Sequence, residues 1–94
     1  MMKKPVWEDR SVLLKKEREF IEELERGAKQ KLFIDINERN EIVELSTLDC
    51  GIKKIPEGLG RLKPLEYFDI KDDKISELPS SIGDLHELKH LLIY

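Results

Sequence analysis

The chain has 94 residues, of which 39% are charged and 39% hydrophobic, and its formal net charge at pH 7 is −3. This length leaves room for one small domain with a thin core. No apolar run approaches the roughly 18 residues that a membrane-spanning helix needs, so we expect no membrane partner. The start of the chain lacks the apolar stretch of a secretory signal peptide, and a lone cysteine suits a reducing compartment, so we expect a cytoplasmic protein.

Charge is distributed unevenly along the chain. Residues 1–31 carry a net charge of +2, whereas residues 32–94 carry a net charge of −5. A nucleic acid requires a basic face to neutralise its phosphates, and the acidic second part of the chain does not supply one. We therefore expect no nucleic-acid partner.

The first predicted element is a helix over residues 9–26. Asp9 or Ser11 is suited to cap its start by accepting a backbone N–H bond, and Gly27 is suited to end it in the left-handed conformation. Glutamates fill one side of this segment. The other side carries apolar residues at helical spacing, which predicts a buried stripe: Leu13, Leu14, Phe20, Ile21 and Leu24.

A β-hairpin is predicted to follow the helix. Residues 32–36 are typical of a strand, residues 37–40 are polar and turn-forming, and residues 42–45 resume as a second strand.

From this second strand onward the sequence repeats itself every 23 residues. Residues 42–64 align with residues 65–87 without a gap, and residues 88–94 begin a third copy. Pro56 matches Pro79, and Gly60 matches Gly83. The apolar residues also match, as in the pairs Ile42/Leu65, Leu45/Phe68, Ile52/Ile75, Ile55/Leu78, Leu59/Ile82 and Leu62/Leu85. A fixed period of this length indicates a solenoid, in which each unit buries its apolar face against its neighbours.

The repeat reads L-x-x-L-x-L-x-x-(N/C)-x-L-x-x-L-P-x-x-I-G-x-L, and residues 65–85 match it best. This motif resembles the leucine-rich repeat family, in particular its 23-residue L-P-x-x-I-G-x-L class. The resemblance covers residues 42–94, which amount to about two and a half repeats, and implies a short solenoid with a parallel sheet.

The combined expectation is an α+β fold that forms a single structural domain. Residues 1–31 would supply a lead-in and a capping helix, and residues 32–94 the hairpin and the leucine-rich repeats. An N-terminal cap is physically required, because an open first repeat would expose its apolar cross-section to water.

Strand periodicity separates the inward from the outward side chains of each repeat. The inward positions are Leu45, Thr47, Phe68, Ile70, Leu91 and Ile93. Stacked at the 23-residue period, the outward positions form three rows: Glu44–Tyr67–His90, Ser46–Asp69–Leu92 and Leu48–Lys71–Tyr94. Aromatic and charged groups together are typical of a recognition patch. The alternative is that these are ordinary exposed strand residues. The resemblance implies that this concave face binds a protein partner.

No constellation of residues predicts catalysis. His86 and His90 fall on different parts of the repeat and should not converge on a metal ion, and Cys50 occupies a structural position with no histidine placed to activate it. Asp49, Asp72 and Asp73 lack the spacing of a calcium loop and are interpreted as turn residues. We therefore expect no enzyme activity, no cofactor and no metal site.

The C-terminal strand presents an alternative role. Residues 88–94 would form an edge strand with an apolar flank, and such an edge invites pairing with another strand. The leading hypothesis is a non-enzymatic protein-interaction module. The alternative is a structural subunit or fragment that completes its core by self-association, as a homodimer joined through Leu88–Tyr94.

Overall fold

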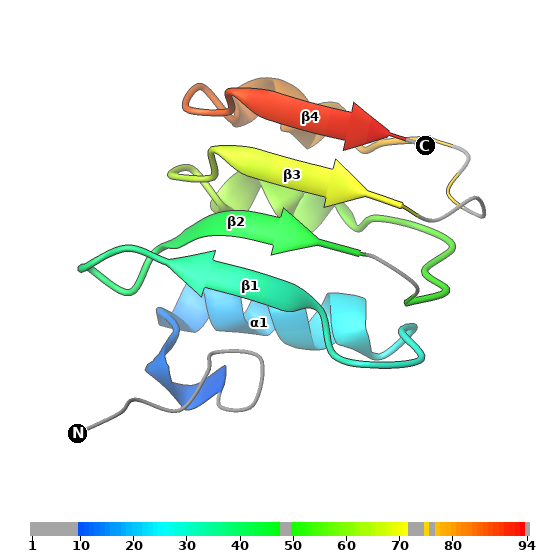
Figure 1. Ribbon diagram of the computed structural model, residues 1–94, viewed down its shortest axis with the longest axis horizontal. Helices are drawn as coiled ribbons and strands as arrows, with labels where there is room; N and C mark the ends of the chain where they lie inside the picture. The colour runs from blue at the N-terminus through cyan, green and yellow to red at the C-terminus, as the bar shows by residue number, and fades with distance from the viewer. Residues whose placement is uncertain (1–9, 48–49, 72–74, 76, 94) are drawn as a thin grey trace.

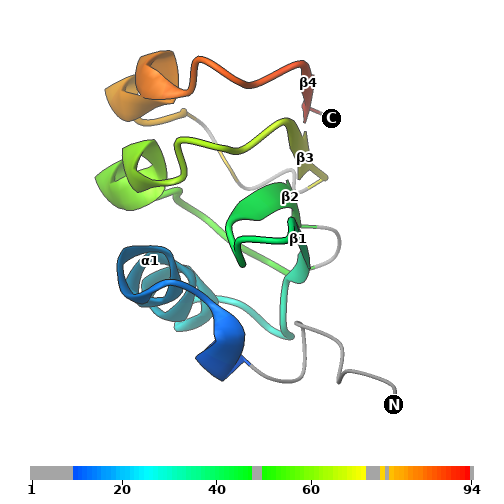
Figure 2. The ribbon, with the colours of Figure 1, turned by 90° about the vertical axis from the view of Figure 1, so that its left-hand side faces the viewer.

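The computed structural model describes residues 10–47, 50–71, 75 and 77–93. Its helical elements are η1 (Arg10–Val12), α1 (Lys15–Glu25), η2 (Glu57–Arg61) and η3 (Ser80–Asp84), where η denotes a 3-10 helix. Its strands are β1 (Phe33–Ile36), β2 (Ile42–Ser46), β3 (Tyr67–Ile70) and β4 (His90–Ile93). The strands form one open mixed sheet in the order β1-β2-β3-β4, with the helical elements on one side of it (Figures 1 and 2). The fold is therefore α+β. Within the described ranges, no helix has the length and apolar character required to cross a bilayer.

The N-terminal helix is shorter than predicted. Helix α1 begins at Lys15, and its N-cap residue Leu14 is extended (φ −61°, ψ 146°) and provides no side-chain capping bond. Ser11 lies within the separate 3-10 turn η1, so its prediction as the helix cap is wrong, and Asp9 lies outside the described residues. Gly27 does not adopt the predicted left-handed conformation, since Gly51 alone among the described glycines has a positive φ. The helix ends instead on Arg26, which keeps a helical conformation.

The apolar side of the helix is buried, with one exception. Phe20 and Ile21 are completely enclosed, and Leu24 and Leu13 are nearly so, although Leu13 lies just before α1. Leu14 is 45% exposed because it occupies the extended N-cap position, so its assignment to the buried stripe is wrong. Phe20 packs close to η2, where it would lie 3.0 Å from a Cβ added to Gly58. The helix thus covers the first part of the core.

The predicted hairpin is confirmed. Strands β1 and β2 pair antiparallel, with Phe33 opposite Ser46 and Asp35 opposite Glu44. Asn37 organises the turn between them, because its Oδ1 accepts backbone N–H bonds from residue 39 at 2.9 Å and from residue 41 at 3.0 Å. Asn40 completes the turn in the left-handed conformation, with φ 64°. Asparagine tolerates this conformation better than most residues do.

The strands after the hairpin pair in parallel at the predicted period. Glu44 lies beside Tyr67, and Tyr67 lies beside His90, so each step across the sheet advances 23 residues. On the inner face, the predicted inward residues of β2 and β3, together with Thr47, are buried: Leu45, Thr47, Phe68 and Ile70. Strand β4 differs, because its inward residues Leu91 and Ile93 remain 39% and 57% exposed at the edge of the sheet.

Each parallel crossover passes through a 3-10 helix. Pro56 and Pro79 cap η2 and η3 with φ near −65°, the value to which the proline ring is restricted. The two 3-10 helices lie side by side (Figure 2). A Cβ added to Gly60 on η2 would meet the Cβ of Ser81 on η3 at 2.9 Å, so only glycine permits this close approach. The matching glycine of η3, Gly83, has nothing within 4 Å of that position.

Two groups of polar contacts attach the N-terminal segment to β2 and to the chain just before β1. The Glu17 carboxylate accepts the backbone N–H of Ile42 at 2.8 Å. Arg10 forms an ion pair with Glu25 and donates to the carbonyl of Leu32 at 2.9 Å, while Glu25 accepts the Leu32 N–H at 2.9 Å. These bonds connect η1, α1 and the chain entering β1, so the segment before the hairpin packs as part of the domain.

Candidate functional site

The face of the sheet that points away from the helical elements is called the outer face here (Figure 2). The strand register arranges its side chains in two rows across the four strands. The first row consists of Asp35, Glu44, Tyr67 and His90, and the second of Phe33, Ser46, Asp69 and Leu92. The two predicted rows that begin at Glu44 and Ser46 are therefore brought together as expected, and the hairpin extends each of them by one residue.

The β3–β4 end of the first row is an aromatic pair. The rings of Tyr67 and His90 are stacked, with their centroids 4.8 Å apart and their planes inclined by 6°. The pair is held by the parallel register of β3 and β4, which places the two side chains directly beside each other. Tyr67 is 41% exposed, so the stack presents a broad, partly apolar surface to solvent. Amphipathic rings of this kind are frequent anchors in protein interfaces.

The acidic end of the first row adjoins this stack. Asp35 and Glu44 lie directly opposite each other on β1 and β2, and Glu44 is the neighbour of Tyr67. Like charges placed opposite each other in a sheet repel, and a cationic group above them would relieve that repulsion. The row therefore runs from a negatively charged end to an aromatic end.

The second row has an apolar residue at each end and a polar centre. Phe33 and Leu92 are 50% and 48% exposed. Between them, Ser46 is only 9% exposed, so little of this predicted contact residue is accessible. Asp69 approaches Lys71, with 3.6 Å between Oδ2 and Nζ. The Oδ1 of Asp69 is buried without a hydrogen-bond partner.

The remaining predicted residues fall partly outside the described ranges. Of the third row only Lys71 is described, and Leu48 and Tyr94 lie outside the described residues. The outer-face residues that sequence reasoning missed are Phe33 and Asp35. Their signal was present in the hairpin, because antiparallel pairing brings the outward residues of the first strand onto the same face as those of the second.

Among the described residues, the histidines and the cysteine considered for catalysis or metal binding do not lie together. His86 follows η3, whereas His90 lies on β4 and stacks on Tyr67. Cys50 is buried, as expected for a structural position. Within the described ranges, no group of three or more His, Cys, Asp or Glu side chains is arranged to hold a metal ion. Asp49, Asp72 and Asp73 lie outside the described residues.

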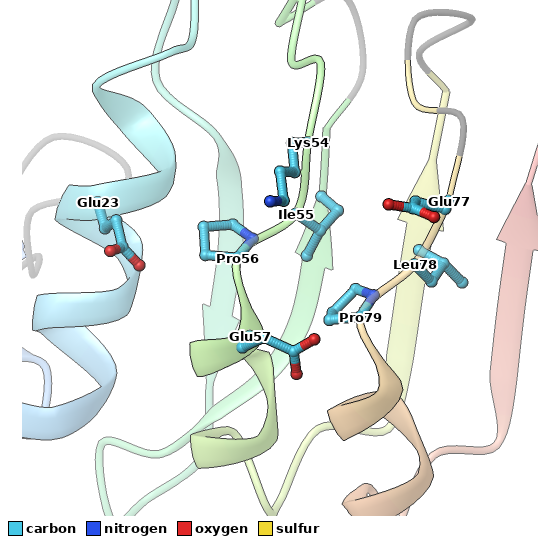
Figure 3. A pocket seen from close by; sticks show the side chains of 8 residues that line it. All are labelled: Glu23, Lys54, Ile55, Pro56, Glu57, Glu77, Leu78 and Pro79. Carbon is cyan, nitrogen blue, oxygen red and sulfur yellow. The ribbon is translucent and has the colours of Figure 1, made fainter.

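A cleft of about 510 Å³ opens on another side of the molecule, between α1 and the segments that enter η2 and η3 (Figure 3). Three glutamates, one lysine and four apolar side chains line it: Glu23, Lys54, Ile55, Pro56, Glu57, Glu77, Leu78 and Pro79. Among the described residues, the buried polar side-chain atoms without a partner belong to Thr47 and Asp69, neither of which lines this cleft. The outer face is therefore the stronger candidate site.

Comparison with known proteins identifies no related protein. No protein-family model matches the chain, and no match is found among curated proteins or solved structures.

Proposed function

We propose that this protein is a non-enzymatic interaction module that binds a protein partner through the outer face of its sheet. The observation that carries the proposal is the exposed Tyr67–His90 stack on a face that α1, η2 and η3 leave uncovered. Strand β3, which carries Tyr67, is fixed by the buried side chains of Phe68 and Ile70, so the partner would meet a ring whose backbone needs little ordering. Preorganisation of this kind lowers the entropic cost of binding.

The 23-residue repeat supports the same proposal from the sequence side. We interpret the chain as a short leucine-rich repeat solenoid capped by α1 and the hairpin. The strand register at multiples of 23 residues, the proline-capped 3-10 crossovers and the glycine contact between η2 and η3 all fit that interpretation. In such proteins the exposed sheet face is the usual binding surface, although resemblance at the level of fold gives no partner.

The chemistry of the two rows describes the partner surface that would fit. An apolar or aromatic side chain of the partner would cover the Tyr67–His90 stack, and a basic side chain would approach Asp35 and Glu44. Phe33 and Leu92 would supply apolar contacts at the two sides. The lone buried Cys50 supports a reducing compartment such as the cytoplasm as the place where this occurs.

The experiment is a quantitative affinity capture on the immobilised protein. Proteins enriched by the wild-type chain are compared with those retained by a Tyr67→Ala/His90→Ala double variant. The control is a Val12→Ala/Leu14→Ala double variant, which removes two apolar side chains with similar exposure (41% and 45%) before α1. The proposal predicts a partner that the control retains and whose capture by the Tyr67/His90 variant falls by at least roughly tenfold, the loss typical of an aromatic anchor. A partner that both variants retain equally would place the site elsewhere.

A further inference from the structure

The strongest unexplained feature of the molecule is the free edge of β4. Leu91, Leu92 and Ile93 are 39%, 48% and 57% exposed, although the corresponding residues of β3, apart from Asp69, are buried. Within the described residues, β4 is the last strand of the sheet and no further strand pairs with it. A free, apolar strand edge is a template for pairing with another strand.

The opposite edge of the sheet, formed by β1, carries features that prevent pairing with another strand, whereas the β4 edge does not. Strand β1 carries an exposed Asp35 and a bulge between Asp35 and Ile36. A charge and a bulge are the devices by which proteins prevent edge-to-edge association. Strand β4 has neither device, because its sequence is His-Leu-Leu-Ile and its register with β3 is regular.

We propose that β4 pairs antiparallel with β4 of a second copy of this chain, with Leu92 opposite Leu92 on the two-fold axis. This register places Leu91 opposite Ile93 on the inner face in both halves of the interface. It leaves Lys89, which contacts Glu66 at 3.3 Å, outside the paired segment. The resulting assembly is one continuous sheet of two copies. It joins them through the β4 edge, where Leu92 also belongs to the second row of the outer face.

Alternative registers fit the side chains less well. Centring the pair on Leu91 would place Lys89 opposite Ile93 on the inner face, and centring it on His90 would place two imidazoles against each other. Opposite residues of antiparallel strands must share a face, so no register pairs Leu91 with Leu92. Only the pairing centred on Leu92 brings all three exposed apolar residues against apolar residues and opposes no charge.

The backbone supports the same register. The N–H of His90 donates to the carbonyl of Glu66 on the β3 side. Because successive residues of a strand direct their backbone groups to opposite edges, those of Leu91 and Ile93 point to the open side. In the proposed register these two residues face each other and exchange hydrogen bonds in both directions, and Leu92 forms the closer pair without hydrogen bonds.

The side on which the helical layer lies also selects antiparallel pairing. A two-fold axis perpendicular to the sheet keeps the helical layers of both copies on the same side, so that Leu91 and Ile93 of both copies share one core. A parallel pairing related by two-fold symmetry would place the helical layers on opposite sides and expose these residues again. Closed two-fold pairing is also the commonest form of self-association.

The first test is the oligomeric state, measured by light scattering from about 1 µM to 1 mM, because a single strand pair makes a small and weak interface. The proposal predicts a concentration-dependent dimer for the wild-type chain. Leu92→Lys should abolish it by placing two ammonium groups on the two-fold axis. Phe33→Lys is the matched control, since Phe33 is equally exposed on the outer face but lies on the protected strand β1. A wild-type chain that stays monomeric throughout, or a dimer lost equally in both variants, would overturn the proposal.

The second test reports the register. Leu92→Cys should form an interchain disulfide under mild oxidation, because opposite residues without hydrogen bonds place their Cα atoms about 4.5 Å apart, within the range of a disulfide. His90→Cys should not cross-link, because its counterpart is displaced along the strand. The buried Cys50 of the unmodified chain provides the background level of cross-linking. Efficient cross-linking through position 90 and not through position 92 would rule out the proposed register.

Discussion

The carboxylate of Glu17 on α1 and the backbone N–H of Ile42 at the start of β2 form a 2.8 Å hydrogen bond inside the protein. Both residues are buried, and Glu17 is only 4% exposed. The bond connects the N-terminal helix to the first strand of the 23-residue repeat. Burial raises the pKa of Glu17, while the hydrogen bond from Ile42 lowers it and the nearby Glu41 raises it further, so that the net shift is upward.

This shift predicts how stability depends on pH. A carboxyl group whose pKa is raised in the folded state binds its proton more tightly there than in the unfolded chain. The stability that this tighter proton binding provides is therefore complete below about pH 4.3, the ordinary pKa of a glutamate. It is lost as the pH rises through the pKa that Glu17 has in the folded protein. Glu17→Gln keeps an oxygen that can accept the Ile42 N–H and removes the charge. Urea unfolding should show the variant gaining stability relative to wild type as the pH rises from about 4 to 7. A stability difference that is constant over this range would contradict the assignment.

Phe68 and Tyr67 are neighbours on β3 with opposite orientations, and they test the phase of the strand. Phe68 is 1% exposed, so Phe68→Ala should cost roughly 3–5 kcal/mol through lost burial and the cavity left behind. Tyr67→Ala removes an exposed ring and its stack on His90, and should cost at most about 1.5 kcal/mol. Denaturant midpoints measured on the two variants check the prediction. Equal midpoints would mean that the alternation assigned to β3 is wrong.

Gly60 and Gly83 occupy equivalent positions in the repeat but different surroundings. Gly60→Ala should destabilise the protein by roughly 1–3 kcal/mol, because the new methyl group would collide with Ser81. Gly83→Ala meets nothing within 4 Å and has no positive φ, so it should stabilise the protein by about 0.4–1 kcal/mol through the reduced entropy of the unfolded chain. Thermal unfolding of both variants decides the matter. A Gly83→Ala variant that loses as much stability as Gly60→Ala would refute the open environment of η3.

Arg10 connects elements that are distant in the sequence. Its Nε lies 3.2 Å from Oε1 of Glu25, and its side chain also donates to the carbonyl of Leu32. Arg10→Ala should cost about 1.5–3 kcal/mol, because these are partly buried hydrogen bonds to a charged group. The control is Arg26→Ala, which removes an exposed arginine at the end of α1 and should change stability little. Similar denaturant midpoints for the two variants would show that the Arg10 contacts are unimportant.

The sheet was predictable from the sequence because the two-residue alternation of strands and the 23-residue repeat are both present in this region. Strand alternation decides which residues point outward, and the 23-residue repeat decides which residues lie beside each other, as with Tyr67 and His90. The hairpin followed from the polar turn around Asn37 and Asn40. The parts of the two rows that lie on β2, β3 and β4 were therefore predictable from residues 42–94, whereas Phe33 and Asp35 on β1 were missed.

The parts that were not predictable depend on contacts that a local pattern does not contain. Helix α1 begins after Leu14 rather than at Asp9, and the preceding turn is held by Arg10 bonds that span 15 and 22 residues of sequence. The 9% exposure of Ser46 was also not predictable, because strand alternation indicates which face a side chain occupies and not how far its neighbours cover it. The upward shift in the pKa of Glu17 likewise arises from its enclosure beneath the sheet.

The position of β4 at the rim of the sheet has a consequence for the internal motions of the protein. Because β4 packs against β3 alone while β2 is enclosed by β1, β3 and the core, opening of the backbone should be easiest at β4 and hardest at β2. Amide hydrogen exchange should therefore be fastest at Leu91 and Ile93 in dilute solution. In concentrated solution the same amides should become protected if β4 of a second chain pairs with this strand. Slower exchange at these residues would then report the association at the level of single residues.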